Sequence, residues 1–237
     1  MNASMGLASE TLFLKGPSST ITAGEGAGLF AAAYACMLAA DKDRADAIVA
    51  VGADELGKIP FYMYLLEEHK YVPAEGAACI ILGGTETGRR RPVAEVEGIG
   101  IAGPKLLARA ITTSLKGTGP EEVDAVFYSH YGNAKMEELY NHTFSKIWGD
   151  SLTTVPLINI TGHMGYAEAS GSLFALLLAL EAGKKGFSIK GFNPENGSRI
   201  NKVLIVSDSY TSGSCSLLLD TGNDQEKGYK KGLLSYA

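Results

Sequence analysis

The chain has 237 residues, enough for one large domain with a substantial hydrophobic core. Its net charge of −5 argues against a nucleic-acid-binding protein, and no apolar run is long enough to span a membrane. No secretion signal is recognisable at the N-terminus, and Cys36, Cys79 and Cys215 lie far apart, without the spacing of metal ligands. We therefore expect a cytoplasmic protein with free thiols, no metal and no cofactor.

The first part of the chain predicts four elements in order. Short β-branched runs favour strands over residues 19–24, 46–53 and 76–82. Residues 25–40 are rich in alanine and small side chains, which is typical of a buried helix. The order is therefore strand, helix, strand, strand.

The second part repeats this order at greater length. Residues 155–162 predict a strand, 164–183 a buried helix, and 202–208 and 215–219 two further strands. Four additional elements precede them: strands at 93–102 and 123–129, and helices at 104–115 and 134–148.

The sequence is thus a duplicated α/β unit whose first copy lacks two strands and two helices. Such a sheet should expose apolar surface or an unpaired edge, which favours an obligate partner. Two alternatives remain open: residues 1–18 cover the gap, or the chain is a fragment of a longer protein.

Several segments resemble motifs of the β-ketoacyl synthases. Residues 13–18 (FLKGPS) are similar to their FGLKGP segment, and residues 49–54 (VAVGAD) to the end of their AGGTE strand. Residues 72–82 (VPAEGAACIIL) resemble VLGEGAGVLVL, and residues 161–163 (TGH) resemble the GH of KSxxGHxxGAAG. No motif is intact, so the resemblance depends on their number, order and spacing.

The resemblance implies an α/β thiolase-like fold with α/β/α/β/α layers, truncated in its first repeat. We expect one domain over residues 1–237, with a partial first repeat at 1–88 and a complete second repeat at 92–220.

The resemblance also implies that the catalytic set is incomplete. The position of the family's nucleophilic cysteine is Gly24, and the family's lysine is replaced by Ile158. The first family histidine matches His130, or Ser129 if no residue is inserted, and the second matches His163. Tyr210 best matches the gating phenylalanine.

Two interpretations of the function follow. The favoured one is a non-catalytic subunit of the chain-length-factor type, similar to those of aryl-polyene-type polyketide systems, that pairs with an active ketosynthase and reaches an acyl carrier protein through that complex. The alternative is an acyl-transfer enzyme that uses a non-standard nucleophile such as Ser129, Cys79 or Cys215. In the first case His163 is a structural residue, and in the second it binds an acyl carbonyl.

Ketosynthase-like subunits pair through the strand that precedes the nucleophile. The resemblance therefore places Ser19, Thr20, Ile21 and Thr22 at an interface with the partner ketosynthase. The aromatic segment around Phe61 and Tyr62 is a second candidate, since aromatic side chains often anchor interfaces, although it could equally pack on the chain's own core.

Overall fold

The structure is a computed structural model that describes residues 3–41, 44–66, 70–83, 92–130, 132–182, 200–222 and 233–235. Its α-helices are α1 (Ala3–Thr11), α2 (Ala27–Ala39), α3 (Lys58–Leu66), α4 (Leu107–Ser114), α5 (Ala134–Trp148), α6 (Thr161–Met164) and α7 (Ala169–Ala182). Its strands are β1 (Ala47–Asp54), β2 (Gly76–Gly83), β3 (Ala94–Ala102), β4 (Ala125–Ser129), β5 (Leu157–Asn159), β6 (Lys202–Ser209), β7 (Gly213–Asp220) and β8 (Leu233–Ser235). The short 3₁₀ helices η1 (Gly24–Gly26), η2 (Pro120–Glu122) and η3 (Gly149–Thr153) complete these elements.

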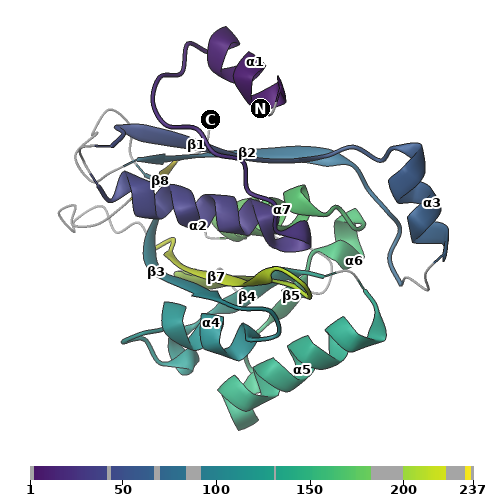
Figure 1. Ribbon diagram of the computed structural model, residues 1–237. Coiled ribbons are helices and arrows are strands. Elements are labelled where there is room, and N and C mark those ends of the chain that lie inside the picture. Colours follow the sequence, from purple (N-terminus) through teal and green to yellow (C-terminus); the bar gives the residue numbers. More distant parts are fainter. Residues whose placement is uncertain are drawn as a thin grey trace.

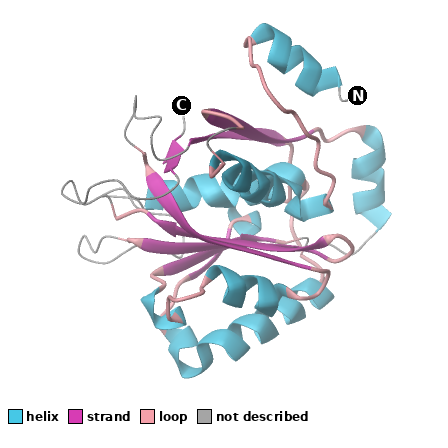
Figure 2. Cartoon of the chain, turned by 60° about the vertical axis from the view of Figure 1, so that its left-hand side comes forward, coloured by secondary structure: helices cyan, strands magenta, loops and turns pink. Residues whose placement is uncertain are grey.

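The helices and strands form layers (Figure 1). The hairpin of β1 and β2 lies on one side of the central helices α2 and α7, and the strands β3, β7, β6, β4 and β5 lie on the other. Helices α4 and α5 cover the outer face of this five-stranded part, as Figure 2 also shows. The short strand β8 pairs with both β2 and β3, and so joins the two parts into one sheet of order β1-β2-β8-β3-β7-β6-β4-β5.

Small residues let the two central helices approach each other closely. A Cβ added to Gly28 of α2 would lie 2.2 Å from the backbone oxygen of Ala169, so only glycine fits there. The backbone N–H of Leu29 donates a hydrogen bond of 3.0 Å to Ser172 Oγ on α7. The two halves of the chain therefore share one core at this contact.

The end of β1 fixes the start of α7. The carboxylate of Asp54 accepts hydrogen bonds from the backbone N–H groups of Ala169, at 3.0 Å, and Ser170, at 2.6 Å. These groups have no partner within their own helix, and a negative charge is favourable at a helix N-terminus. Asp54, at the end of the AGGTE-like segment, thus has a structural role.

The two halves of the chain follow a similar order of elements. In the second half β5, α7, β6 and β7 follow one another, and α2, β1 and β2 follow residues 19–23 in the first half. In both halves the last two strands pair antiparallel. The expected strands and helices of the second half are also present, although α4 begins at Leu107, after Pro104, and β5 covers only three residues.

The strand expected at residues 19–24 is not formed within this chain. In the second half the equivalent strand, β5, pairs with β4, which also pairs with β6. The first half has no described equivalent of β4, so residues 19–23 have no neighbouring strand with which to pair. The prediction of a strand here was wrong for the single chain.

Residues 3–18 do not cover the gap in the first half. They form α1 and a following segment in which Leu12, Phe13 and Leu14 are exposed, Phe13 to 86%. On the outer face of the hairpin Val51 is 55% exposed, and Cys79 beside it is also exposed. The expectation of exposed apolar surface is thus confirmed, and the alternative that residues 1–18 bury it is wrong for the described part of this segment.

Candidate functional site

The sequence resemblance matches Gly24 to the position of the family's nucleophile. This glycine opens η1, which leads directly into α2, and its φ is +54°. A Cβ at this position would lie 3.0 Å from Ser209 Oγ at the end of β6. Glu25 follows with a buried side chain, so a carboxylate, and no thiol, occupies the start of the helix.

A buried polar network lies beside this junction. Tyr140 of α5 donates its hydroxyl to the backbone oxygen of Ser129 at 3.2 Å and accepts the backbone N–H of Asp208 at 2.9 Å. Burial is the main cause that raises the pKa of Tyr140 well above its usual value, and the charge of Glu25 raises it further. Burial also raises the pKa of Asp208, while the hydroxyl of Ser214 donates to that carboxylate and opposes the shift.

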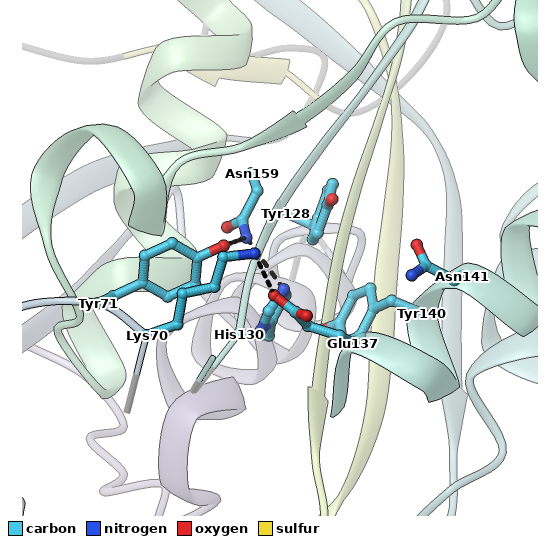
Figure 3. A pocket seen from close by; sticks show the side chains of 8 residues that line it. All are labelled: Lys70, Tyr71, Tyr128, His130, Glu137, Tyr140, Asn141 and Asn159. Atoms are coloured by element: carbon cyan, nitrogen blue, oxygen red, sulfur yellow. Dashed lines mark hydrogen bonds and ion pairs between the residues drawn. The ribbon is translucent and has the colours of Figure 1, made fainter. Parts of the chain in front are cut away.

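A polar cleft of about 210 Å³ lies at the C-terminal end of β4 (Figure 3). Its walls come from the loop before β2, from β4, from α5 and from β5. The lining residues are Lys70, Tyr71, Tyr128, His130, Glu137, Tyr140, Asn141 and Asn159.

His130 is the buried centre of this cleft. Its Nδ1 accepts the backbone N–H of Gly132 at 2.9 Å, and its Nε2 lies 3.0 Å from the side-chain nitrogen of Asn159. Its own backbone N–H donates to Thr161 Oγ1 at 3.3 Å. Burial is the main cause that lowers the pKa of His130 to about 4, so the imidazole is neutral at physiological pH.

Tyr71, from the first half of the chain, covers His130. The two ring centroids are 5.8 Å apart in an edge-on arrangement, and Asn159 donates its side-chain N–H to the Tyr71 hydroxyl at 3.0 Å. A Cβ on Gly132, whose φ is +84°, would lie 2.5 Å from the Tyr71 ring, so glycine is required beneath it. Tyr71 therefore fills the space next to one side of the imidazole.

The backbone around Tyr71 is held in place by the second half of the chain. Ala74 donates its N–H to the oxygen of Tyr166, and Tyr166 donates its own N–H to the oxygen of Val72, both at 2.7 Å. Lys70 forms an ion pair of 2.6 Å with Glu137 of α5 at the mouth of the cleft. These contacts tie the loop at residues 70–74 across the site.

The structure separates the residues that the sequence linked to catalysis. Of the two candidates for the first histidine, His130 lines the cleft, whereas Ser129 is buried with its Oγ facing Gly171 of α7. His163, on α6, is exposed and is not among the residues that line the cleft. Ile158 is buried in the core, so no cation takes the place of the family's lysine there.

Tyr210, matched to the gating phenylalanine, lies in the turn between β6 and β7 and is exposed. The Nζ of Lys105 lies 4.1 Å from its ring centroid, and a hydrogen bond from Lys105 is the main cause that lowers the pKa of Tyr210. A gating role remains a prediction.

The residues expected at an interface are accessible. Ser19, Thr20 and Thr22 are exposed, and Ile21 is partly exposed. Phe61 and Tyr62 project from α3 and are exposed, Tyr62 to 63%. The alternative that these two aromatic side chains pack on the chain's own core is therefore wrong.

Sequence reasoning missed most of the cleft. Tyr71 and Asn159 are 88 positions apart and meet only through the fold. Lys70 and Glu137 are likewise distant in sequence and belong to different halves. Besides His130, which the sequence had singled out, the available signal was Asn159, which lies in the predicted strand two residues before the Thr-Gly-His segment.

Within the described ranges, no group of His, Cys, Asp and Glu side chains could hold a metal ion. No helix among the described residues is long and apolar enough to cross a membrane.

No protein-family model matches the sequence, and neither does any curated protein. Solved structures with similar folds do exist. A type II polyketide synthase acyl-carrier protein in complex with its ketosynthase (AntDE:AntF) contains a chain that matches with a TM-score of 0.78 and 17% identity, over 91% of this chain and 65% of that one. The ishigamide ketosynthase/chain length factor matches with a TM-score of 0.72 and 17% identity, over 86% of this chain and 60% of that one.

A third structure is the ketosynthase ApeO in complex with its chain length factor ApeC from Xenorhabdus doucetiae. It matches with a TM-score of 0.69 and 18% identity, over 91% of this chain and 63% of that one. This chain thus spans less than two thirds of the length of these three neighbours. The shared architecture shows that the chain has the thiolase-like fold of the ketosynthases and chain length factors.

Proposed function

We propose that this chain is a non-catalytic, ketosynthase-like subunit of the chain-length-factor type, which pairs with an active β-ketoacyl synthase in fatty-acid or polyketide chain elongation. The observation that carries the proposal is Gly24, the glycine that opens η1, the short helix that leads into α2. A thiol there would gain acidity from the helix N-terminus, and Gly24 has no side chain to carry an acyl group.

The cleft supports the same conclusion. Tyr71 covers His130, and its hydroxyl is bonded to Asn159. His130 is neutral and makes its hydrogen bonds within the chain. This arrangement suits a stable structural centre better than a site that admits an acyl thioester.

The alternative, an enzyme with a non-standard nucleophile, finds little support in the candidate side chains. Cys215 is fully buried, and its burial raises the pKa of the thiol. Cys79 lies in the middle of β2 on the outer face, and partial burial raises the pKa of this thiol too. Ser129 Oγ is buried against α7, and none of these three groups stands at the helix junction beside Gly24.

The proposal includes three finer statements. The chain length factor ApeC, named in one neighbouring structure, supports an assignment to aryl-polyene-type systems. The neighbour that contains an acyl-carrier protein with its ketosynthase supports indirect contact with such a carrier through the partner. We place the complex in the cytoplasm, where Cys36, Cys79 and Cys215 would remain thiols, as they are in the structure.

Two measurements test the proposal. The chain is co-expressed with candidate ketosynthases and analysed by size-exclusion chromatography, where a stable heterodimer is expected. The purified chain is then incubated with acyl carrier thioesters, and its intact mass is expected to stay unchanged. A stable acyl adduct on any residue would refute the non-catalytic assignment, and the absence of a heterodimer with every candidate would refute the pairing.

A further inference from the structure

The strand β1 has one edge without a partner in the described part of the chain. It pairs with β2 along all eight of its residues, and its opposite edge carries no described strand. Its sequence, Ala-Ile-Val-Ala-Val-Gly-Ala-Asp, contains no lysine, arginine or proline, and its single charge is at the end. Proteins commonly protect exposed edges with charges or prolines, because an open edge pairs readily with other strands. This edge has no such protection.

The adjoining face of the hairpin is apolar and exposed. Ala47, Val51 and Ala53 of β1 are exposed there, together with Ala77 and Cys79 of β2. In Figure 1 the described helix on this side of the hairpin is α1, and its Leu7 is itself exposed. The opposite face, which includes Ala50, is buried against the central helices. Among the described residues, the hairpin thus has a core on one side only.

The second half of the same chain shows what covers such an edge. There β6, the counterpart of β1, pairs in parallel with β4, and β4 pairs in parallel with β5. Helix α5 follows β4 and packs Tyr140 and Phe144 against the sheet in one apolar cluster with Val126 and Leu204. The counterpart of β5 is the segment at residues 19–23, which has no described strand beside it.

Large apolar side chains are exposed on the hairpin and in the segment that precedes residues 19–23. The described residues that contribute large apolar exposure include Val51 on the hairpin and Leu12 and Phe13 before residues 19–23.

We infer that a separate polypeptide supplies a β-strand followed by an amphipathic helix, and that this strand inserts between β1 and residues 19–23, parallel to β1. The helix lies on the outer face of the hairpin, over Val51 and Cys79. The inserted strand gives residues 19–23 the neighbour that they lack. Their other edge then remains available to the ketosynthase, so the inference rests on the proposed function and extends it.

The occupant has a defined chemistry. Its strand must be apolar on the side that faces α2, as Phe127 of β4 is on the side that packs with α7. Its helix must present an apolar stripe, since the hairpin offers alanine, valine and cysteine side chains without charges. Main-chain hydrogen bonds would provide much of the affinity, as in other cases of strand addition.

Hydrogen–deuterium exchange tests this inference. The tagged full chain is recovered with its partners from its native cells and compared with the isolated chain at low concentration. We expect slower exchange at residues 47–54 and at residues 19–23 together, and alkylation of Cys79 slowed by about tenfold or more. Cys215, buried in both states, is the internal control. Protection confined to residues 19–23 would refute the inserted strand but would still agree with pairing to a ketosynthase. Protection of neither segment would refute both the inserted strand and the pairing.

A pair of matched variants makes the test specific. Val51→Lys places a charge on the hairpin's outer face, where an exposed side chain should leave the isolated chain folded. It is expected to restore fast alkylation of Cys79 and fast exchange at residues 47–54. Ile101→Lys changes an exposed apolar position of β3 in the other half. In this variant Cys79 and residues 47–54 are expected to stay protected. If the two variants behave alike while circular dichroism shows both to be folded, the proposed docking face is wrong.

Discussion

Gly24 combines two local constraints on any attempt to restore a nucleophile. Its φ of +54° is unfavourable for residues with a Cβ, and a Cβ would approach Ser209 Oγ to 3.0 Å. We expect Gly24→Cys to lower the free energy of unfolding by about 1–2 kcal/mol, measured by urea denaturation. We also expect no condensing activity with acyl and malonyl carrier thioesters, because Ile158 and Tyr71 remain. Substantial product formation by this variant would show that the loss of the thiol alone silences the chain.

His130 should make stability depend on pH. Its pKa falls from an ordinary 6.5 to about 4 on folding, mainly because of burial. Between these values the unfolded chain binds more protons than the folded one, so stability rises with pH across this window and is fully present above 6.5. We expect urea midpoints to fall from pH 7 to pH 4, with a contribution of up to about 3 kcal/mol from this residue.

The matched variant for this prediction is His130→Phe, which keeps an aromatic ring beside Tyr71 and Tyr140. It should be less stable at pH 7, because Asn159 and the N–H of Gly132 lose an acceptor. Its stability should, however, change less between pH 6.5 and pH 4. An equal slope in both proteins would mean that His130 is not the group that titrates.

A proline in the segment at residues 19–23 should weaken pairing with the proposed ketosynthase more than it weakens folding of this chain. Ile21 lies in no ladder of the isolated chain, so Ile21→Pro should leave its circular dichroism nearly unchanged. In the complex it would remove a main-chain donor, at a cost of about 3 kcal/mol, which weakens the ketosynthase complex by roughly a hundredfold. Isothermal titration or dilution chromatography would measure this loss.

Thr113→Pro is the control, because it interrupts α4 and should reduce folding itself. Its effect should appear in the circular dichroism of the isolated chain as well as in the complex. A complex of unchanged affinity in Ile21→Pro would move the interface elsewhere, with the exposed aromatic residues of α3 as the next candidate.

At the level of elements, periodicity and small-residue composition predicted the central helices and most of the strands. The helix at residues 134–148 has the predicted bounds, because Asn133 caps it through a 2.9 Å hydrogen bond to the N–H of Met136 and Gly149 ends it. The prediction of a strand at residues 19–24 was wrong because a strand needs a neighbouring strand, and a local sequence pattern cannot supply one. Most of the cleft could not be predicted for a similar reason, since Tyr71 reaches Asn159 only after the two halves have packed.

On the scale of the whole molecule, the open edge and exposed hairpin face predict poor behaviour of the isolated chain. We expect it to aggregate or self-associate at micromolar concentration, because an unprotected apolar edge pairs with further copies. Light scattering and sedimentation velocity would measure this, and Val51→Lys should reduce it. A sharp monomer that unfolds cooperatively at these concentrations would mean that the chain needs no partner to satisfy its surface.

Contacts between the two halves of the chain should also affect how quickly the fold can form. The hydrogen bond from Leu29 to Ser172 spans 143 positions, and the one from Ser207 to Glu25 spans 182. Closing loops of this length before any contact is gained slows folding. The second half contains its own five strands and covering helices, so it can fold first. Helix α2 and the hairpin of β1 and β2 can then pack against it. Until then the apolar surface of the first half is exposed, and transiently exposed apolar surface favours aggregation.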